Sequence, residues 1–371
     1  MKAVAVFPKQ KEIRRIDHEE PQASGPDDVL IQMLEVGICG TDKEICSFEY
    51  GTPPDDSEYL VLGHESLGRV IEVGPEVSRL KAGDLVIPSV RRPCPHEHCR
   101  ACRAGRQDFC FTGDFTERGI KQQHGFLAER VVEQQEFLNV VATPLRDVAV
   151  LIEPLTVAEK ALRQVWDVQE RLPWASPDTL DESGKYRWQA LVLGAGPVGL
   201  LGAMTLARRG FETYVYSREP IGGPRSQIVH AVGGRFISAS ETSVAELPDI
   251  IESIDLVYEA TGASRLCFEV LKYLGTNGVF VFTGVPGRKA PIEVETDLIM
   301  RNLVLKNQVV FGTVNADRQA FEDAAEDLQS FVEMWPAAVR SLISGHYPLD
   351  EHEELLRGHV AGIKNVIQLS S

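Results

Sequence analysis

Basic side chains are scarce in this 371-residue chain, in which 38 Lys and Arg oppose 54 Asp and Glu and leave a formal net charge of −16. A protein this acidic is not expected to bind nucleic acids or anionic membranes in general. The deficit still allows one anionic cofactor to bind, because a single arginine and the N-terminus of a helix are sufficient for that.

Long hydrophobic runs are also missing. Residues 1–15 lack the apolar core and the cleavage site of a signal peptide and predict a strand followed by a polar turn. Residues 190–207 are uncharged and reach the lower length limit of a membrane helix, but their glycines and Pro197 predict a strand, a turn and a helix instead. We therefore expect a cytoplasmic protein, not a membrane protein, whose seven cysteines are reduced thiols or metal ligands.

The pattern of hydrophobic segments changes along the chain. Short β-like runs, separated by Gly, Pro and Asp, fill the first 150 residues and predict a small irregular β domain. From Ala190 onwards strand-like and helix-like segments alternate, which predicts a parallel sheet with helices on both faces. Since 371 residues exceed what one hydrophobic core usually serves, we expect two domains and an α/β fold.

A glycine-rich turn follows the first strand of the alternating region. A G-x-G-x-x-G pattern lies between the strand-like residues 190–193 and a helix-like segment. The first glycine permits a tight turn, the second lets the backbone approach a pyrophosphate, and the third lets helix and strand pack closely. We therefore predict a dinucleotide site whose turn consists of Gly194, Ala195, Gly196, Pro197, Val198 and Gly199.

The end of the next strand bears on the choice of dinucleotide. It reads Tyr216-Ser217-Arg218, without the Asp or Glu that usually binds the ribose 2′-hydroxyl of NAD. Because Arg218 can bind a 2′-phosphate, NADP is the expected cofactor. Glu219 follows directly, so use of both NAD and NADP stays open, as does a purely solvated role for Arg218.

Two short motifs in the β-rich region point to a metal. Cys39 lies in a Gly-Ile-Cys-Gly-Thr-Asp stretch and His64 in a Gly-His-Glu stretch that continues as GHESLGRVIEVGPEVSRLKAGDLV. In these motifs the sequence resembles the zinc-dependent medium-chain dehydrogenases, and the resemblance covers essentially the whole chain. It implies a GroES-like catalytic domain over residues 1–157, a Rossmann NAD(P)-binding domain over residues 158–315 and a return of residues 316–371 to the catalytic domain.

The resemblance also implies a catalytic zinc ion. Cys39 and His64 would be ligands, Glu65 a ligand or an exchangeable neighbour, and Glu153 the third candidate ligand. This agrees with the chemistry of catalytic zinc sites, which have about three protein ligands and one open position.

Two residues that follow Cys39 have expected roles in the reaction. A zinc ion would act as a Lewis acid that favours the alkoxide of a substrate hydroxyl while hydride leaves carbon. Thr41 would accept the substrate proton and pass it on. Asp42 would fix the tautomer of the His64 ring, with a simple turn residue as the alternative for Asp42.

Cysteines and histidines crowd residues 94–110. Cys99, Cys102 and Cys110 match the last three positions of the family's structural zinc lobe. The usual first cysteine would stand at His96, whereas Cys94 stands two residues earlier, at a spacing that zinc sites also use. We expect Cys94 as the fourth ligand, with His96 as the alternative. Four ligands leave no open position, so this zinc would stabilise a loop and would not bind substrate.

Within the family, the chain looks most like the archaeal-type glucose 1-dehydrogenases, through stretches such as VRRPC, TERGIKQQHGF, EPLTVAEKA and FGTVNA. This implies an aldose-binding set of Thr41, Glu117, Glu153 and Asn315, although Glu117 could also be a surface carboxylate. Carboxylates and amides suit a sugar, which presents several hydroxyls. The resemblance adds cofactor contacts at Tyr216, Ser217, Arg218, Thr283, Gly284, Val285, Thr313, Val314, Asn315 and Lys364.

The chain also departs from its relatives. Many of them carry two adjacent arginines where this chain has Ser217 and Arg218, which leaves strict NADP preference open. Some carry a substrate-binding carboxylate where this chain has Val157, which leaves the sugar specificity open.

We therefore expect an enzyme that transfers hydride from C1 of an aldose, with D-glucose as the first candidate, to NADP or NAD and forms the aldonolactone. A polyol (sorbitol-type) or L-threonine-type zinc dehydrogenase is the alternative, and a non-catalytic NADPH-binding protein is the alternative from another class. The family expectation for assembly is a homodimer or a homotetramer.

Overall fold

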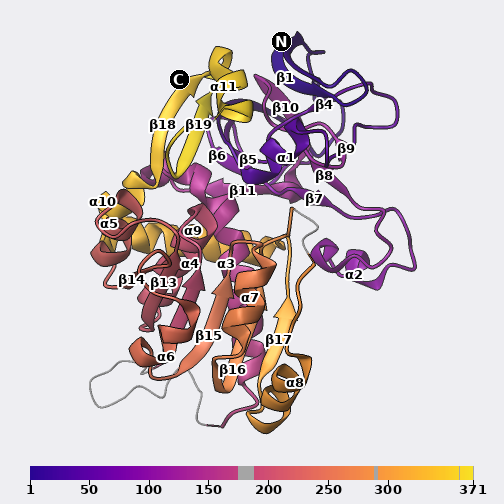
Figure 1. The fold of residues 1–371 in the computed structure, drawn as a ribbon. Coiled ribbons are helices and arrows are strands. Elements are labelled where there is room, and N and C mark those ends of the chain that lie inside the picture. Colours follow the sequence, from indigo (N-terminus) through magenta and orange to yellow (C-terminus); the bar gives the residue numbers. More distant parts are fainter. Residues whose placement is uncertain (174–187, 288–290, 359, 371) are drawn as a thin grey trace. The chain divides into compact units, whose positions relative to one another are not determined.

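A computed structural model describes residues 1–173, 188–287, 291–358 and 360–370. The chain divides into two compact units. The first unit consists of Met1–Thr156, Asn315–Val332 and Arg340–Ser371, and the second of Val157–Val314 and Glu333–Val339. Both chain termini therefore belong to the first unit (Figure 1).

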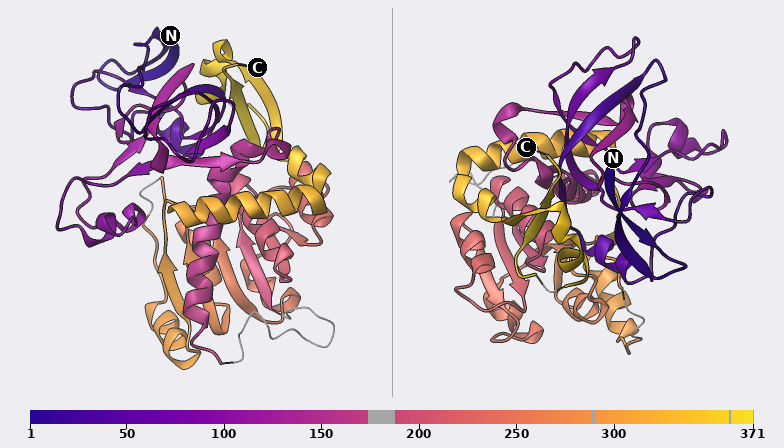
Figure 2. Two further views of the ribbon diagram at one scale, coloured as in Figure 1. Left: turned by 180° about the vertical axis from the view of Figure 1, so that it is seen from behind. Right: turned by 90° about the horizontal axis from the view of Figure 1, so that it is seen from above.

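The first unit is built mainly on antiparallel sheets. Its largest sheet has seven strands in the order β11-β6-β5-β3-β19-β18, with β10 paired to β3. These strands are β3 (Asp28–Gly37), β5 (Glu65–Val73), β6 (Leu85–Pro88), β10 (Arg130–Gln134), β11 (Leu138–Val141), β18 (Ile343–Pro348) and β19 (Lys364–Gln368). The last two run side by side in every view, and β19 pairs with β3, so the end of the chain completes this sheet (Figures 1 and 2).

Two smaller sheets and a few helices complete the first unit. One sheet joins β2 (Glu12–Asp17), β1 (Lys2–Phe7) and β4 (Leu60–Val61), and the other joins β7 (Arg91–Arg92), β8 (Thr116–Arg118) and β9 (Gln122–Gln123). The helices include α1 (Gly40–Cys46), α2 (Arg100–Arg103), most of α9 (Arg318–Met334) and α11 (His352–Arg357), whereas most of α10 (Pro336–Ser341) belongs to the second unit. The core lies under the large sheet, where alternate residues of β3 such as Val29, Ile31 and Met33 are completely buried.

The second unit is a doubly wound parallel sheet of six strands in the order β14-β13-β12-β15-β16-β17. The strands are β12 (Gln189–Leu193), β13 (Glu212–Ser217), β14 (Arg235–Ser238), β15 (Ile254–Glu259), β16 (Leu274–Phe282) and β17 (Val309–Gly312). The helices are α3 (Ile152–Gln169), α4 (Pro197–Arg208), α5 (Pro224–Ala231), α6 (Leu247–Ile250), α7 (Ser264–Leu271) and α8 (Thr296–Leu305). This order is that of a dinucleotide-binding fold and confirms the predicted α/β class.

Helices cover both faces of this parallel sheet. In Figure 1 α7 lies in front of the strands, and in the view from behind in Figure 2 α3 lies in front of them. The central strand β12 is accordingly apolar on both sides, with Ala190, Leu191, Val192 and Leu193 all fully buried.

The segment that resembled a membrane helix is a strand, a turn and a helix, as predicted. β12 ends at Leu193 and α4 begins at Pro197. Among the helices of the described residues, none combines the length and the apolar character that crossing a membrane requires.

Candidate metal and dinucleotide sites

The first candidate metal cluster forms where β3 ends and β5 begins. Gly37 and Glu65 are paired across these two antiparallel strands, which brings the segment after β3 next to His64. One ligand atom from each of Cys39, His64 and Glu65 lies within 4.8 Å of the others. His64 and Glu65 are buried and Cys39 is partly buried. A thiolate, an imidazole and a carboxylate in a sheltered place are a donor set that zinc prefers, so these residues fit that metal.

Asp42 lies directly behind this cluster. It belongs to the first turn of α1, and its Oδ2 accepts a hydrogen bond from the Cys39 N–H at 2.9 Å, while its Oδ1 is 3.4 Å from His64 Nδ1. Burial alone would raise the pKa of Asp42, but the His64 imidazole and the Cys39 N–H hold it below its usual value. Asp42 is therefore placed to orient both Cys39 and His64.

Lys364 occupies a position that the sequence did not indicate. Its side chain is only 2% exposed, and its ammonium donates to the carboxylate of Glu65. The resemblance placed Lys364 at the cofactor, and that role stays a prediction. It also donates to the Ile38 carbonyl at 3.2 Å. Although burial opposes it, the neighbouring carboxylate of Glu65 raises the pKa of Lys364, which keeps it charged. The two residues are 299 positions apart, so no local motif could have paired them.

Glu153 lies in the first turn of α3 and is partly buried. It is not one of the three groups that lie within 4.8 Å of one another. Burial raises the pKa of Glu153 despite the nearby His64, and the Glu65 carboxylate adds to this rise. The residue therefore shares the electrostatic environment of the cluster, and its role as a zinc ligand stays a prediction.

The residues expected to bind sugar are partly brought together. Glu117, buried on β8, accepts a hydrogen bond from Asn315 Nδ2 at 3.0 Å. The same carboxylate oxygen accepts two from Arg91, at 3.0 Å from Nε and 2.9 Å from Nη2. Glu117 is thus not a surface carboxylate. Arg91 was missed as an individual residue, although it lies in the quoted VRRPC stretch. Thr41 lies in the first turn of α1 and is partly buried.

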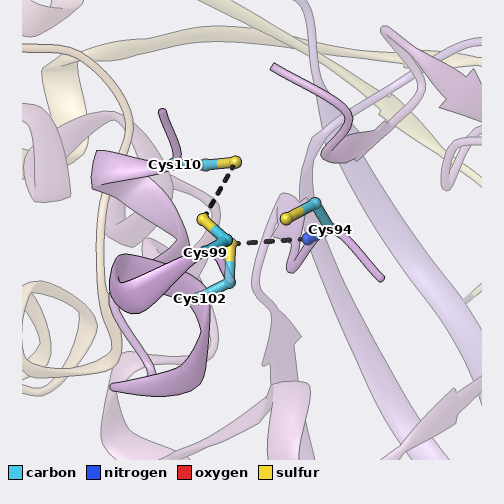
Figure 3. A group of neighbouring side chains, drawn as sticks. All are labelled: Cys94, Cys99, Cys102 and Cys110. Atoms are coloured by element: carbon cyan, nitrogen blue, oxygen red, sulfur yellow. Dashed lines mark hydrogen bonds between the residues drawn. The ribbon is translucent and has the colours of Figure 1, made fainter. Parts of the chain in front are cut away.

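The second candidate metal cluster is a lobe of four cysteines around α2 (Figure 3). The sulfur atoms of Cys94, Cys99, Cys102 and Cys110 lie within 4.8 Å of one another. The Cys94 N–H also donates to Cys102 Sγ at 3.4 Å. The alternative ligand His96 is not in the group, and its Nε2 is 2.5 Å from an Asp114 oxygen. Four thiolates suit a closed, tetrahedral zinc site.

The predicted glycine turn lies at the carboxyl end of β12. Gly194 has a φ of +101°, which an L-residue rarely adopts. A Cβ on Gly199 would collide with the carbonyl of Gly194, whereas a Cβ on Gly196 would meet nothing within 4 Å. Gly199 is thus needed for packing within the protein. Open space at Gly196 is what close approach of a pyrophosphate requires.

A pocket of about 970 Å³ opens at this turn. It is lined by residues at or directly after the carboxyl ends of β12, β13 and β15, including Gly194, Ala195, Gly196, Tyr216, Ser217 and Arg218. Ligands of doubly wound sheets bind at this edge. Tyr216 forms part of the pocket wall, and its hydroxyl donates to the Thr242 carbonyl at 2.8 Å, which fixes the position of its side chain.

The other expected cofactor residues are held by hydrogen bonds of the second unit. Thr283 donates to the Glu259 carbonyl at 2.6 Å, and the Gly284 N–H donates to the Glu259 carboxylate at 3.1 Å. From α3, Gln164 donates to the Thr313 hydroxyl at 2.7 Å, and Lys160 donates to the Val314 carbonyl at 2.8 Å. The side chains of Val285 and Val314 are exposed. Glu259 and Lys160 were not identified from the sequence.

The chain combines a doubly wound unit that carries a glycine turn with a β-rich unit that brings together residues of the types that bind zinc. This combination defines a zinc-dependent medium-chain dehydrogenase. The alcohol dehydrogenase GroES-like domain family matches residues 25–144, and the glucose dehydrogenase C-terminus family matches residues 146–369. The chain belongs to the glucose dehydrogenases among the zinc-dependent medium-chain dehydrogenases.

Individual relatives agree over their full lengths. The glucose 1-dehydrogenase of Methanocella arvoryzae is 37% identical, with all of both chains covered, and that of Thermoproteus tenax is 36% identical with the same coverage. Among solved structures, the Haloferax mediterranei glucose dehydrogenase in complex with NADP, Zn and gluconolactone has a TM-score of 0.87 and 29% identity, again over all of both chains.

Proposed function

We propose that this protein is a zinc-dependent glucose 1-dehydrogenase that oxidises D-glucose at C1 to the lactone and reduces NADP, with NAD as a second acceptor. The observation that carries this proposal is the convergence of Cys39, His64 and Glu65 in a chain that matches glucose 1-dehydrogenases from end to end. Residues 1–157 and 316–371 are proposed as the catalytic domain and residues 158–315 as the cofactor domain.

Cys39, His64 and Glu65 would hold the catalytic zinc, with Glu153 as a further ligand. When bound there, zinc supplies a Lewis acid that favours the deprotonated form of the C1 hydroxyl. The four cysteines of the lobe would hold a structural zinc and stabilise a loop that has little core of its own.

The chain's own residues then have separate tasks. Asp42 fixes the ring of His64. Thr41 accepts the proton of the C1 hydroxyl and passes its own hydroxyl proton on to solvent, so that it ends neutral. Glu117 and Asn315 bind sugar hydroxyls from a network that Arg91 holds in place. Such a network favours a polyhydroxylated substrate over a simple alcohol, because buried polar groups that lose their partners are costly.

The cofactor would lie in the pocket at the glycine turn. Gly194–Gly199 would face its pyrophosphate and Arg218 its 2′-phosphate. Further cofactor contacts would come from Thr283–Val285, Thr313–Asn315 and Lys364. We infer a cytoplasmic location, because the cysteine lobe needs reduced thiols to bind metal. A homodimer or homotetramer is the expected assembly, which light scattering of the purified protein would establish.

The test is the initial rate of NADPH formation with D-glucose, D-galactose, D-xylose, sorbitol and L-threonine, before and after chelation. We expect chelator-sensitive reduction with an aldose and an acidic product after lactone hydrolysis. Activity only with sorbitol or L-threonine would overturn the sugar assignment and leave the zinc mechanism in place.

Two cysteine variants sharpen this test. Cys39→Ala should lose the catalytic zinc and the activity together. Cys46→Ala is the matched control, because Cys46 is buried seven residues later and lies outside both metal clusters. Full activity of Cys39→Ala without its zinc would contradict the proposed mechanism.

A further inference from the structure

Besides Arg218, a second arginine, Arg225, lines the part of the proposed cofactor pocket next to the carboxyl end of β13. The pocket is lined by Arg218 and Glu219, which come directly after this strand, and by Arg225 from the first turn of α5. The Arg218 side chain is exposed, whereas Arg225 is 26% exposed and Glu219 is 44% exposed. Three charged groups thus surround the position at which a doubly wound fold receives the ribose next to the adenine.

Glu219 is held in a defined position by its surroundings. Arg225 Nη1 donates to Glu219 Oε1 at 2.9 Å. The Glu219 carbonyl accepts a hydrogen bond from the Ser238 hydroxyl at 2.9 Å, which fixes the backbone of the loop against β14. On the other side of the loop, the Gly222 N–H donates to the Ser226 hydroxyl at 2.9 Å, which fixes the start of α5. The ion pair therefore joins two anchored segments.

The charges of Arg218, Glu219 and Arg225 determine which dinucleotide the pocket favours. A carboxylate close to the ribose accepts a hydrogen bond from a 2′-hydroxyl but repels a 2′-phosphate. An arginine that binds this carboxylate cancels the repulsion. Because a guanidinium has five N–H donors and a permanent charge, the same side chain can also bind a phosphate. Ser217 is small and neutral, so it supplies no second positive charge of its own.

We infer that Arg225 is a specificity-determining residue of the cofactor site: it holds Glu219 away from the ribose and, together with Arg218, binds the 2′-phosphate of NADP(H). The inference rests on the proposed function, whose cofactor it concerns. It accounts for an NADP preference in a chain with a serine before Arg218 and a glutamate after it. Loss of Arg225 should shift the preference towards NAD(H), because Glu219 would then be free to bind the 2′-hydroxyl of NAD(H).

The test measures binding of NADPH and NADH to the zinc-loaded protein by cofactor fluorescence, without any sugar. For Arg225→Gln we expect the Kd of NADPH to rise about tenfold, the lower end of what loss of a charged hydrogen bond causes. The Kd of NADH should stay unchanged or fall. The matched control is Arg235→Gln, because Arg235 pairs with Glu212 at the opposite end of the same strand, β13, away from the pocket.

A double variant separates the two tasks of Arg225. If Arg225 contacts the phosphate itself, Arg225→Gln should still weaken NADPH binding in a Glu219→Gln background. Full recovery of NADPH binding in that background would overturn the direct contact, and an equal loss of NADPH and NADH affinity in the single variant would overturn the specificity role.

The experiment is independent of catalysis. If NADPH binds with the expected pattern but no aldose is oxidised, the proposed function fails and the assignment of Arg225 stands. If the wild-type protein binds NADPH and Arg225→Gln leaves its Kd unchanged, the assignment of Arg225 fails and the proposed function stands.

Discussion

Asp42 shows how one buried carboxylate can orient the residues of a candidate metal cluster to which it does not itself belong. It is 1% exposed, accepts a hydrogen bond from the Cys39 backbone and lies 3.4 Å from the His64 ring. A carboxylate in this position fixes the ring tautomer and makes the imidazole a better ligand. Cys39 and His64 of the candidate cluster are therefore oriented by a neighbour that is three positions along the chain from Cys39.

Replacing Asp42 should weaken the catalytic zinc site selectively. We expect Asp42→Asn to lower zinc affinity there by about 10- to 100-fold, as loss of such a supporting carboxylate typically does. Competition with a chromogenic chelator measures this affinity. The four-cysteine lobe is the internal control, because it should retain its zinc in the same titration. Equal weakening of both sites, or of neither, would contradict the role of Asp42.

His124 is another titratable residue of the first unit, and it is partly buried. Its ring stacks on Tyr59, with centroids 5.1 Å apart, and its Nδ1 accepts a hydrogen bond from the Val61 N–H at 3.1 Å. Burial, with smaller contributions from the charges of His18 and Arg118, lowers the pKa of His124 to about 4. The folded protein therefore keeps this imidazole neutral under mildly acidic conditions.

This low pKa makes stability depend on pH. Above pH 6.5, the ordinary value, the imidazole is neutral in both states. As the pH falls from there to about 4, the unfolded chain binds a proton that the folded chain does not, so the free energy of unfolding decreases. We expect His124→Asn, which keeps an acceptor for Val61, to lose less stability across this window than the wild type. Urea unfolding at a series of pH values measures the difference.

The control for this comparison is His346→Asn, because His346 is exposed on β18. It should follow the wild-type pH dependence. If His124→Asn also follows it, the neutral state of His124 in the folded protein would be refuted.

At the scale of single elements, the turn between β12 and α4 separates two uses of glycine. A Cβ at Gly199 would collide with the Gly194 carbonyl, whereas the space beside Gly196 is open and its φ of −76° suits any residue. Gly199 is therefore required for packing within the protein, whereas we propose that Gly196 is required for close approach of the cofactor.

The two alanine variants should consequently fail in different assays. We expect Gly199→Ala to cost about 3 kcal/mol of folding free energy, the upper range for overpacking a tight contact. Gly196→Ala should unfold like the wild type but lose NADPH binding, because its methyl group would occupy the path of the pyrophosphate. Chemical unfolding and NADPH fluorescence measure the two effects. NADPH binding by Gly196→Ala at wild-type affinity would contradict this assignment.

These elements also show why some features were predictable from the sequence. The glycine turn and the four-cysteine lobe are local, so the spacing of the glycines indicated the first, and the resemblance to the zinc-dependent medium-chain dehydrogenases indicated the second, with Cys94 or His96 left open as the fourth ligand. In the network of Arg91, Glu117 and Asn315, strand pairing brings Arg91 next to Glu117, 26 positions away, whereas Asn315 is 198 positions from Glu117 and belongs to no strand, so no local pattern indicated it. The pairing of Arg225 with Glu219 is local, but an arginine in the first turn of a helix gives no signal that distinguishes it from a solvated side chain.

On the scale of the whole molecule, the last strand of the chain completes a sheet that is built from strands near its start. β19 pairs with β3, and Lys364 at its start donates to Glu65 at the start of β5. The sequence predicts that residues 316–371 return to the catalytic domain but not which strand they join. The Glu65–Lys364 pair thus reports whether the last segment has docked on the first unit.

Breaking this pair should therefore destabilise the first unit strongly. Both side chains are 2% exposed, and a buried charge that loses its partner typically costs about 3 kcal/mol or more. We expect Lys364→Met to lower the free energy of unfolding by this amount, measured by urea denaturation with chelator present so that metal binding does not contribute. In that background Glu65→Gln should restore part of the loss, because it removes the unpaired carboxylate.

The matched control is Lys2→Met, because Lys2 forms an ion pair with Asp17 that is exposed on the neighbouring sheet. An exposed pair contributes little, so this variant should unfold within about 1 kcal/mol of the wild type. If Lys364→Met behaves like Lys2→Met, the ion pair is not what holds the last strand in place. If Lys364→Met and Glu65→Gln are simply additive, the two residues act independently and the contact between the two ends of the chain carries no coupling energy.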